Sequence, residues 1–369
     1  MAINIGIVGL PNVGKSTLFN ALSKAGAESA NFPFCTIEPN VGVVPVPDAR
    51  LDQLASIYSS ESVIPASLEF VDIAGLVKGA SQGEGLGNQF LSHIRQVHAV
   101  AHVVRCFVDE NVVHVDGSVD PVRDVEVIDT ELLLADLDTV EKRLDRTAKA
   151  AKASGKQGDK AKAELAVLQR LQAHFNDAKP ARTLELTDDE ALIVRDLHLI
   201  TRKPVIYVGN VSEEHASDPT QSDAYRALSD LADTRGAQLL AVSAAIESEV
   251  AQLDAEEAAE YLESMGLEEP GLHRIIKAGY ATLGLITFLT AGPKESRAWP
   301  IREGTKAPGA AGSIHTDFER GFIKAEVMRW EDLVEHKDEA AIKAAGKLRI
   351  EGKEYVVKDG DVMHFRFNV

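Results

Sequence analysis

The sequence contains few cysteines and no long apolar run. Its 369 residues include two cysteines, Cys35 and Cys106, which give neither a disulfide framework nor the spacing of metal ligands. No segment approaches the ~20 consecutive apolar residues that a transmembrane helix needs. The first residues also lack the basic and apolar regions of a secretory signal. We therefore expect a soluble, cytoplasmic protein without a membrane partner.

Basic charge is also scarce. The formal net charge is −18 at pH 7, which argues against indiscriminate binding of nucleic acid, DNA included. One segment differs, because residues 142–162 carry eight Lys or Arg side chains against two Asp. This basic run is either the solvated face of a helix or a contact with RNA phosphates. A phosphate contact needs such a patch on an otherwise repelling surface.

The most informative segment is residues 9–17, which read GLPNVGKST. An apolar strand is expected before it at 3–8 and a helix after it from residue 17, the context that a G-x-x-x-x-G-K-[ST] phosphate loop requires. Glycines let backbone N–H groups converge on phosphate oxygens, and the helix N-terminus adds positive charge. We expect nucleotide contacts from Asn12, Val13, Gly14, Lys15, Ser16 and Thr17. Lys15 would reach the β- and γ-phosphates, and the Ser16 hydroxyl would hold Mg²⁺.

A second element, D-x-x-G at 72–75, follows the strand expected at 67–72. In switch NTPases the Asp of this element supports Mg²⁺ and the Gly N–H bonds the γ-phosphate, roles that fall here on Asp72 and Gly75. A threonine that ligates Mg²⁺ is expected in the loop 26–48. Thr36 is the candidate, and the nearby Ser29 remains an alternative.

The base-reading element departs from that of GTPases, which use Asn-Lys-x-Asp to read guanine. Here the sequence is Asn210, Val211, Ser212 and Glu213. The lysine is missing and the acid is one methylene longer. Backbone groups around Val211, with Asn210 as scaffold, suit adenine, and the loss of a polar contact changes discrimination strongly. We expect ATP to be preferred over GTP; the alternative is that Glu213 still reads guanine.

The position that orients the attacking water also departs from signalling GTPases. Leu76 stands where those proteins have a glutamine, and leucine cannot orient water. Another polar group must act, or hydrolysis is slow. His114 and Gln82 are candidates, although a loop histidine is often only a surface residue.

The order of patterns along the chain predicts an α/β fold with a helical insertion. Strands and helices alternate up to about residue 127 and resume with a strand at 204–209, a helix at 220–235 and a strand at 237–243. Between them, Leu133, Leu137, Val140 and Leu144 recur at helical spacing, as do Leu165, Leu168, Leu171 and Phe175. Two antiparallel coiled-coil helices explain these patterns, with a third helix at 187–201 that Thr187 opens.

The last part of the chain predicts a small α+β domain, with strand-like runs at 282–290, 321–328 and 354–369. The expected organisation is a P-loop NTPase domain at 1–127 and 203–280, a helical insert at 128–202 and a C-terminal domain at 281–369.

Long motifs resemble the YchF/Obg-like ATPase family of P-loop NTPases over nearly the whole chain. Besides residues 9–16 they are 31–37 (NFPFCTI), 71–80 (VDIAGLVKGA), the Asn-x-x-Glu at 210–213, 243–245, 291–293, 297–299 and 311–319 (AGSIHTDFE). The resemblance implies an Obg-type G domain, a coiled-coil insert and a C-terminal TGS domain of the β-grasp type.

The same resemblance implies an activity and its residues. It implies an ATPase with Mg²⁺ on Ser16 and Thr36 and a preference for ATP, with Ser243 also at the nucleotide. His114 matches the water-activating histidine of the family, and Asn12 matches an asparagine that binds K⁺ in potassium-stimulated relatives. Association with the ribosome, its large subunit or the whole particle, would use the basic run 142–162 beside the TGS domain.

The expected reaction is in-line attack of water on the γ-phosphoryl group, with Lys15 and Mg²⁺ offsetting the developing charge. No arginine finger is evident, so turnover should be slow. Two alternatives remain, a GTPase switch and a regulatory binding module in which the nucleotide has only a structural role.

Overall fold

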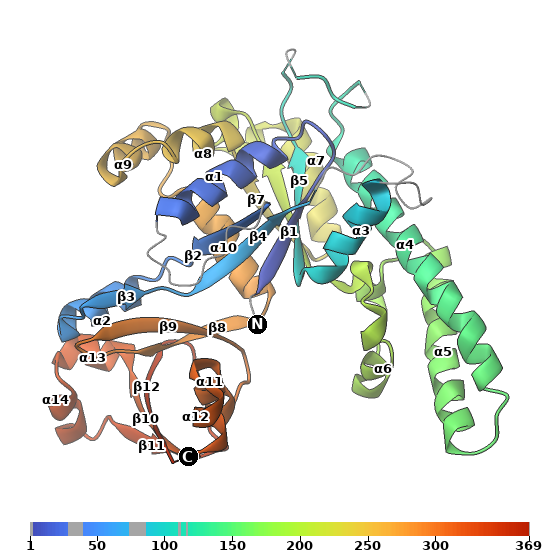
Figure 1. Cartoon of the computed structure of the whole chain (residues 1–369). Coiled ribbons are helices and arrows are strands. Elements are labelled where there is room, and N and C mark those ends of the chain that lie inside the picture. The colour runs from blue at the N-terminus through green and yellow to red at the C-terminus, as the bar shows by residue number, and fades with distance from the viewer. Residues whose placement is uncertain (1–2, 29–39, 74–85, 110–111, 116, 369) are drawn as a thin grey trace. The chain divides into compact units, whose positions relative to one another are not determined.

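The computed structural model describes residues 3–28, 40–73, 86–109, 112–115 and 117–368. It forms two compact units (Figure 1). The first comprises 1–22, 38–42 and 70–272, and the second comprises 23–37, 43–69 and 273–369. Residues 43–69, expected in the nucleotide domain, thus group with the C-terminal segment. The reason is that β3 (Ser62–Ile64) pairs with β9 (Glu295–Arg302).

A six-stranded sheet has the order β2-β4-β1-β5-β6-β7, and β1, β5, β6 and β7 belong wholly to the first unit. The pairs β1–β5, β5–β6 and β6–β7 are parallel, as the alternating pattern predicted. The strands are β1 (Asn4–Val8), β2 (Val41–Pro45), β4 (Ser67–Asp72), β5 (Ala99–Arg105), β6 (Val205–Asn210) and β7 (Gln238–Val242). Every residue of β5 is buried, which is typical of a central parallel strand covered on both faces.

Helices connect these strands. They are α1 (Lys15–Glu28), α3 (Leu86–Gln96), α4 (Pro121–Ala150), α5 (Lys156–Asn176), α6 (Asp188–Ile193), α7 (Asp223–Thr234), α8 (Ala244–Val250) and α9 (Ala255–Ser264), with 3₁₀ turns η2 (Ala181–Thr183), η3 (Arg195–Leu197), η4 (Ile200–Arg202), η5 (Glu213–His215) and η6 (Pro219–Gln221). No helix among the described residues is long and apolar enough to cross a membrane.

Helices α4 and α5 form a hairpin, with the two helices side by side in Figure 1. The predicted apolar positions meet in one core, in which Val140, Leu168, Leu171 and Phe175 are buried and Leu133, Leu137 and Leu144 pack at the edge. Helix α4 begins at Pro121, seven residues before the expected insert boundary at 128. Asp120 caps it by accepting a hydrogen bond from the Arg123 amide (3.1 Å), with proline in the first turn.

The third helix expected at 187–201 is shorter than predicted. Thr187 and Glu190 form the expected capping box, but α6 ends at Ile193 and the chain continues as η3 and η4. The backbone at His198 is left-handed, with φ 47°, which breaks the helical course. Beyond it, the buried Asp136 carboxylate on α4 accepts from the amides of Ile200 (2.9 Å) and Thr201 (2.7 Å). Those amides therefore do not continue a helical ladder.

The second unit contains a sheet with the order β11-β10-β12-β8-β9-β3. Its elements are α2 (Ala49–Tyr58), β3, α10 (Gly271–Thr282), β8 (Leu285–Thr290), β9, α11 (Ala307–Ile314), α12 (Thr316–Arg320), β10 (Phe322–Arg329), α13 (Trp330–His336), α14 (Glu339–Ala344), β11 (Arg349–Glu351) and β12 (Asp361–Phe367). The alanines of α11 pack with Phe288, Phe322 and Met363 in its core. Arg50 at the start of α2 pairs with Asp359 (2.5 Å).

Candidate nucleotide-binding site

The phosphate loop joins β1 to α1 through two residues in the left-handed region. Asn12 has φ 61° and Gly14 has φ 93°. A Cβ at Gly14 would collide with the side-chain amide of Asn210, so this close approach requires glycine. The Gly14 carbonyl then accepts from the Leu18 amide (3.0 Å) and α1 starts. Ser16 and Thr17 lie in the first turn of α1 and are exposed, whereas Val13 is buried.

Lys15 and Asp72 form an ion pair at the carboxyl ends of β1 and β4. Lys15 is 8% exposed, and its ammonium group donates to an Asp72 carboxylate oxygen. The structure therefore brings together the cation expected for phosphate and the carboxylate expected for Mg²⁺. The described part of the chain contains no cluster of three or more His, Cys, Asp or Glu side chains able to hold a metal. The Ser16 hydroxyl and the Asp72 carboxylate are oxygen donors of the kind that Mg²⁺ prefers.

Several expected site residues lie outside the described residues. These are Thr36 and Gly75, the alternatives Ser29 and Gln82, and Leu76. The geometry of the magnesium threonine and of the γ-phosphate amide stays a prediction.

Asn210, at the end of β6, links the phosphate loop to the start of α8. Its amide nitrogen donates to the Val13 carbonyl (2.8 Å), and its amide oxygen accepts from the Ala244 amide (3.0 Å). Ser243, just before α8, is 4% exposed. Asn210 therefore serves as a scaffold between two loops that flank the nucleotide site of such folds.

The backbone next to Asn210 is partly committed to the sheet. The Val211 amide donates to the Val242 carbonyl (2.9 Å) and its side chain is 2% exposed. That amide cannot also donate to a base. The backbone hydrogen bonds that we expect with adenine would therefore have to come from the Val211 carbonyl and the neighbouring groups. Glu213 begins η5 and is exposed.

His114 is buried, which excludes the alternative of a surface residue. Its Nε2 lies 2.8 Å from a carboxylate oxygen of Asp124 in the first turns of α4. The other Asp124 oxygen accepts from Arg123 (3.0 Å). The Asn12 side-chain amide donates to the Val113 carbonyl (3.2 Å), so the phosphate loop touches the residue before the histidine.

Arg105, Arg123 and Asp124 are site residues that no sequence motif indicated. Arg105 closes β5, is 1% exposed and donates to the carbonyls of Phe107 (3.0 Å), Asp109 (3.2 Å) and Val112 (3.0 Å). An arginine that ends an otherwise apolar strand was the available signal, because a buried guanidinium must be paired or hydrogen-bonded. Nothing in the spacing indicated Asp124.

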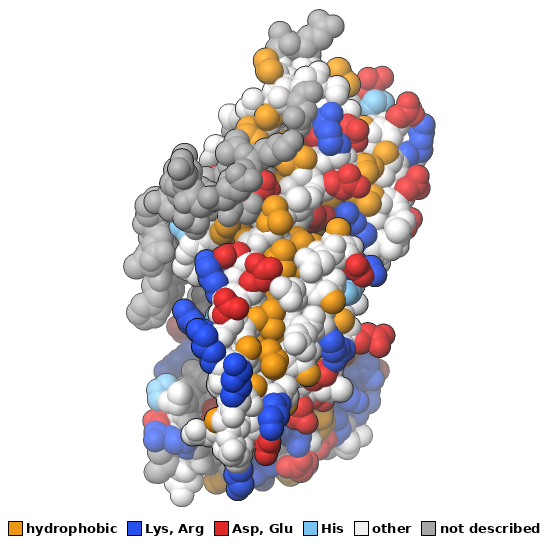
Figure 2. Space-filling model, turned by 90° about the vertical axis from the view of Figure 1, so that its right-hand side faces the viewer, with side chains coloured by type: hydrophobic (Ala, Val, Ile, Leu, Met, Phe, Trp, Pro, Cys, Tyr) orange, Lys and Arg blue, Asp and Glu red, His pale blue; other side chains and the backbone are white. Residues whose placement is uncertain are grey.

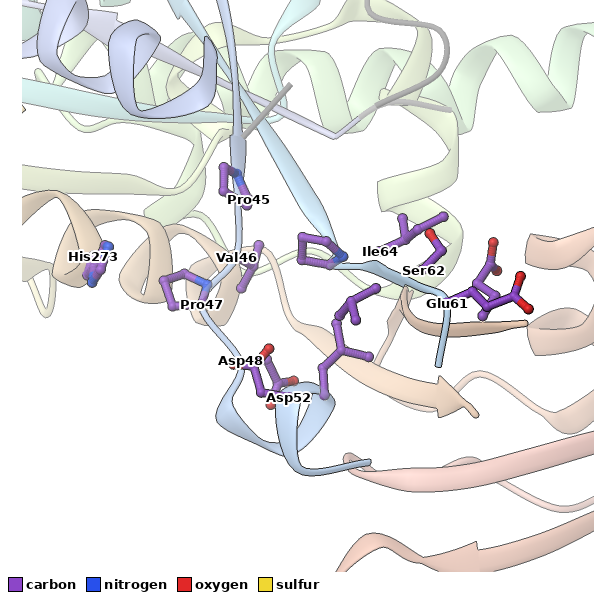
Figure 3. A pocket seen from close by; sticks show the side chains of 13 residues that line it. Pro45, Val46, Pro47, Asp48, Asp52, Glu61, Ser62, Ile64 and His273 are labelled. Atoms are coloured by element: carbon purple, nitrogen blue, oxygen red, sulfur yellow. The ribbon is translucent and has the colours of Figure 1, made fainter. Parts of the chain in front are cut away.

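Cavities also lie away from this site. One of about 850 Å³ in the second unit is lined by Pro45, Val46, Pro47, Asp48, Leu51, Asp52, Glu61, Ser62, Val63, Ile64, Pro65, His273 and Glu295 (Figure 3). Another of about 700 Å³ in the first unit lies against α4 and the end of α5. The described lining of the first cavity contains four carboxylates and no Lys or Arg, which is unsuitable for a triphosphate.

The basic run 142–162 forms the tip of the α4–α5 hairpin. Lys142, Arg143 and Lys162 are paired with carboxylates. Five exposed cations make no ion pair with any residue that the structure describes, namely Arg146, Lys149, Lys152, Lys156 and Lys160. Figure 2 shows Lys and Arg side chains toward the lower end of this face, beside a band of hydrophobic side chains.

Comparisons with known proteins place these features in a family context. The family model YchF-GTPase_C, described as a protein of unknown function, matches residues 285–368, and a model described as a 50S ribosome-binding GTPase matches 4–140. The chain is 54% identical over 369 residues to the ribosome-binding ATPase YchF of Bacillus subtilis, with both chains covered completely. It is 55% identical over 370 residues to that of Escherichia coli O157:H7, again with complete coverage of both. The structure of the Schizosaccharomyces pombe YchF GTPase superposes with a TM-score of 0.90 at 42% identity, covering 99% of this chain and 97% of that one.

Proposed function

The chain belongs to the YchF/Obg-like ATPase family, and from this premise we propose that it binds and slowly hydrolyses ATP with Mg²⁺ and acts as a nucleotide-dependent switch on the ribosome. The observation that carries the proposal is the phosphate loop with Lys15 opposite Asp72. The names of the Bacillus subtilis and Escherichia coli relatives, ribosome-binding ATPases of the same length, support the ATPase and ribosome parts.

The proposed nucleotide contacts follow from the charges in the loop. When a triphosphate enters, Lys15 exchanges the Asp72 carboxylate for the β- and γ-phosphate oxygens, and the amides of residues 12–17 surround the β-phosphate. Ser16 and Thr36 would hold Mg²⁺, with Asp72 supporting it through water. The ion would neutralise charge that develops on the phosphate oxygens.

Hydrolysis is proposed to be in-line attack by a water that His114 orients. The Gly75 amide would bond the γ-phosphate. Asn12 would also bind K⁺ as an activator. The chain offers no arginine finger in its motifs, so we expect slow basal turnover that a partner increases.

The proposed base preference rests on the element at 210–213. An exposed glutamate at 213 replaces the aspartate that accepts from guanine in GTPases. With the Val211 amide engaged in the sheet, the Val211 carbonyl remains as an acceptor for the N6 amino group of adenine. Ser243 lies at the neighbouring loop and completes the proposed base pocket.

The proposed ribosome contacts are the unpaired basic tip of the helical insert 128–202 and the TGS domain at 281–369. Neither segment contains a proposed nucleotide contact, so the proposed nucleotide and ribosome contacts use different residues of the chain. The protein would act in the cytoplasm, where ribosomes are found.

Binding titrations of ATP and GTP, each with Mg²⁺ and K⁺, test the proposal first. We expect ATP to bind at least tenfold more tightly, a difference of about 1.4 kcal/mol. Equal affinity or a preference for GTP would replace the ATPase with a GTPase switch. Measurement of phosphate release under the same conditions and with ribosomes separates a slow enzyme from a binding module, for which no hydrolysis would be detected.

A further inference from the structure

His114 points into the protein, whereas its neighbours point out. Val113 and Val115 are 75% and 53% exposed, whereas His114 is 6% exposed. Its Nε2 lies 2.8 Å from an Asp124 carboxylate oxygen, and that carboxylate is 2% exposed. An imidazole enclosed in this way cannot contact a water molecule on a phosphate at the solvent-exposed start of α1.

We propose that Asp124 is a positioning residue that holds His114 in a resting position, and that His114 must leave this carboxylate before it acts on the attacking water. The inference rests on the proposed function, because it concerns the reaction in which His114 takes part. It adds a residue and a step that the phosphate loop alone does not contain.

Release of His114 would not leave a buried charge without a partner. The second oxygen of Asp124 accepts from Arg123, at 3.0 Å from Nη2 and 3.3 Å from Nε. A buried carboxylate that lost its only cation would be costly. Because Arg123 remains in place, the contact with His114 can break while the Asp124 carboxylate keeps a partner.

The chain that must turn is short. Arg105 donates to the carbonyls of Phe107, Asp109 and Val112, so these three residues are tied to the end of β5. On the other side, Gly117 has φ 76° and its amide donates to the His114 carbonyl (3.1 Å). Rotation of His114 and the adjoining described residues Val113 and Val115 would bring the imidazole out.

The phosphate loop has a direct contact with this segment. The Asn12 side chain donates to the Val113 carbonyl (3.2 Å) and is itself exposed. A nucleotide or cation that draws Asn12 toward itself removes one hold on the residue next to His114. Occupancy of the loop and position of the histidine are therefore coupled.

The kinetic test is Asp124→Asn, which keeps the size of the side chain and removes the charge that faces the imidazole. Charge-assisted hydrogen bonds are roughly twice as strong as neutral ones, so the hold weakens. We expect kcat for ATP to rise several-fold with KM unchanged, and no effect of D124N in a His114→Ala background. Asp124→Ser, which withdraws the carboxylate, is a second variant with the same expected rise.

The matched control is Glu126→Gln. Glu126 is exposed on the same helix, two residues further on, and loses the same charge without facing His114. Its kcat should equal that of the wild type. A fall in kcat for D124N would mean that Asp124 orients His114 in the reacting state. An unchanged kcat would mean that Asp124 does not restrain His114. Either result would overturn the proposal.

A second readout does not need turnover. Diethyl pyrocarbonate modifies accessible imidazoles, and peptide mass mapping gives the rate at each histidine. We expect His114 to react faster in D124N than in the wild type, while His315, with a 60% exposed side chain, and the buried His102 react as before. If His114 were modified at the same rate in D124N and in the wild type, Asp124 would not hold His114, and this conclusion would stand even if the protein hydrolyses ATP. Absence of ATP hydrolysis in the wild type would instead remove the proposed function.

Discussion

The missing side chain of Gly14 is what allows Asn210 to reach the phosphate loop. Gly14→Ala places a Cβ against the Asn210 amide and forces a non-glycine residue to φ 93°. Backbone strain of this kind costs about 1–3 kcal/mol, and the Asn210 bonds to Val13 and Ala244 would be displaced as well. We expect ATP affinity to fall by at least about tenfold, or 1.4 kcal/mol, in a binding titration.

Gly236→Ala is the matched control for Gly14→Ala. Gly236 also has a positive φ, 59°, but a Cβ there would meet no atom within 4 Å. The substitution should lower thermal stability a little and leave ATP affinity unchanged. If both variants bound ATP equally well, the contact between Gly14 and Asn210 would not shape the site.

His102 on β5 makes the first unit sensitive to acid. Burial lowers the pKa of His102 to about 4 from 6.5. Between these values the unfolded chain binds a proton that the folded protein does not, so the free energy of unfolding decreases as the pH falls from about 6.5 toward 4. The stabilisation is present above the unfolded pKa and disappears as the pH drops.

The variant His102→Phe isolates this contribution. We expect the free energy of unfolding, measured with urea, to fall between pH 7 and pH 5 in both proteins. The fall should be about 1–2 kcal/mol larger in the wild type than in the variant. Carboxylates that titrate in both proteins contribute equally to the two decreases, so their contribution cancels in the comparison. Parallel losses in the two proteins would show that His102 becomes protonated in the folded state.

Motif spacing was enough to predict the residues of the phosphate loop. Lys15 and Ser16 follow β1, and Asp72 ends the neighbouring strand β4, so their proximity follows from a local pattern and from adjacent strands of one sheet. The partner of His114 did not follow from any pattern, because Asp124 belongs to a helix start that the sequence analysis placed seven residues later. The commitment of the Val211 amide depends on the register between β6 and β7, which no single-sequence pattern specifies.

Among the elements, α4 and η4 are joined by one carboxylate. Asp136 is fully buried, and it accepts from the amides of Ile200 and Thr201 and from the Thr201 hydroxyl (2.7 Å). Asp136→Ala would leave both amides buried without an acceptor. We expect the free energy of unfolding to fall by about 2–4 kcal/mol, measured by urea unfolding with helical circular dichroism.

Asp138→Ala is the control for Asp136→Ala. Asp138 lies on the exposed side of the same helix and pairs with Lys142, one turn away. An exposed pair of this kind is worth about 0.3–0.5 kcal/mol, so the variant should be nearly as stable as the wild type. Similar losses in the two variants would show that Asp136 is no more than a surface contact.

Elements with local signals were predicted well, and those that depend on distant pairing were not. The strand at 67–72 is confirmed as β4, and the apolar repeats of 133–144 and 165–175 meet in one core. Strand β3 has only three residues and pairs with β9 more than 200 residues away. Strand β9 contains Pro300, a residue that is uncommon inside strands. Strand β3 is held by this long-range pairing, whereas β9 is held mainly by its antiparallel pairing with the preceding strand β8.

At the scale of the whole molecule, the negative net charge repels RNA phosphates, and the tip of the α4–α5 hairpin is the exception. The chain carries a net charge of −18, whereas the tip holds five exposed cations that make no ion pair with any described residue. A surface that repels phosphate elsewhere directs a ribosome contact to this point. The paired cations Lys142, Arg143 and Lys162 are already neutralised and contribute less.

Reversal of charge at the tip should therefore abolish ribosome binding without affecting the nucleotide site. The tip variant carries Arg146→Glu, Lys149→Glu and Lys152→Glu. Its control carries three substitutions in the same unit, at cations that already pair with carboxylates: Arg170→Glu, Lys179→Glu and Arg226→Glu. Each lost phosphate contact should lower the slope of log K against log salt by about 1. We expect the tip variant to stay in the supernatant in co-sedimentation with ribosomes, whereas the control variant should pellet with them as the wild type does. Both variants should bind ATP with the affinity of the wild type. Equal co-sedimentation of the two variants would mean that net charge, and not the hairpin tip, governs the association.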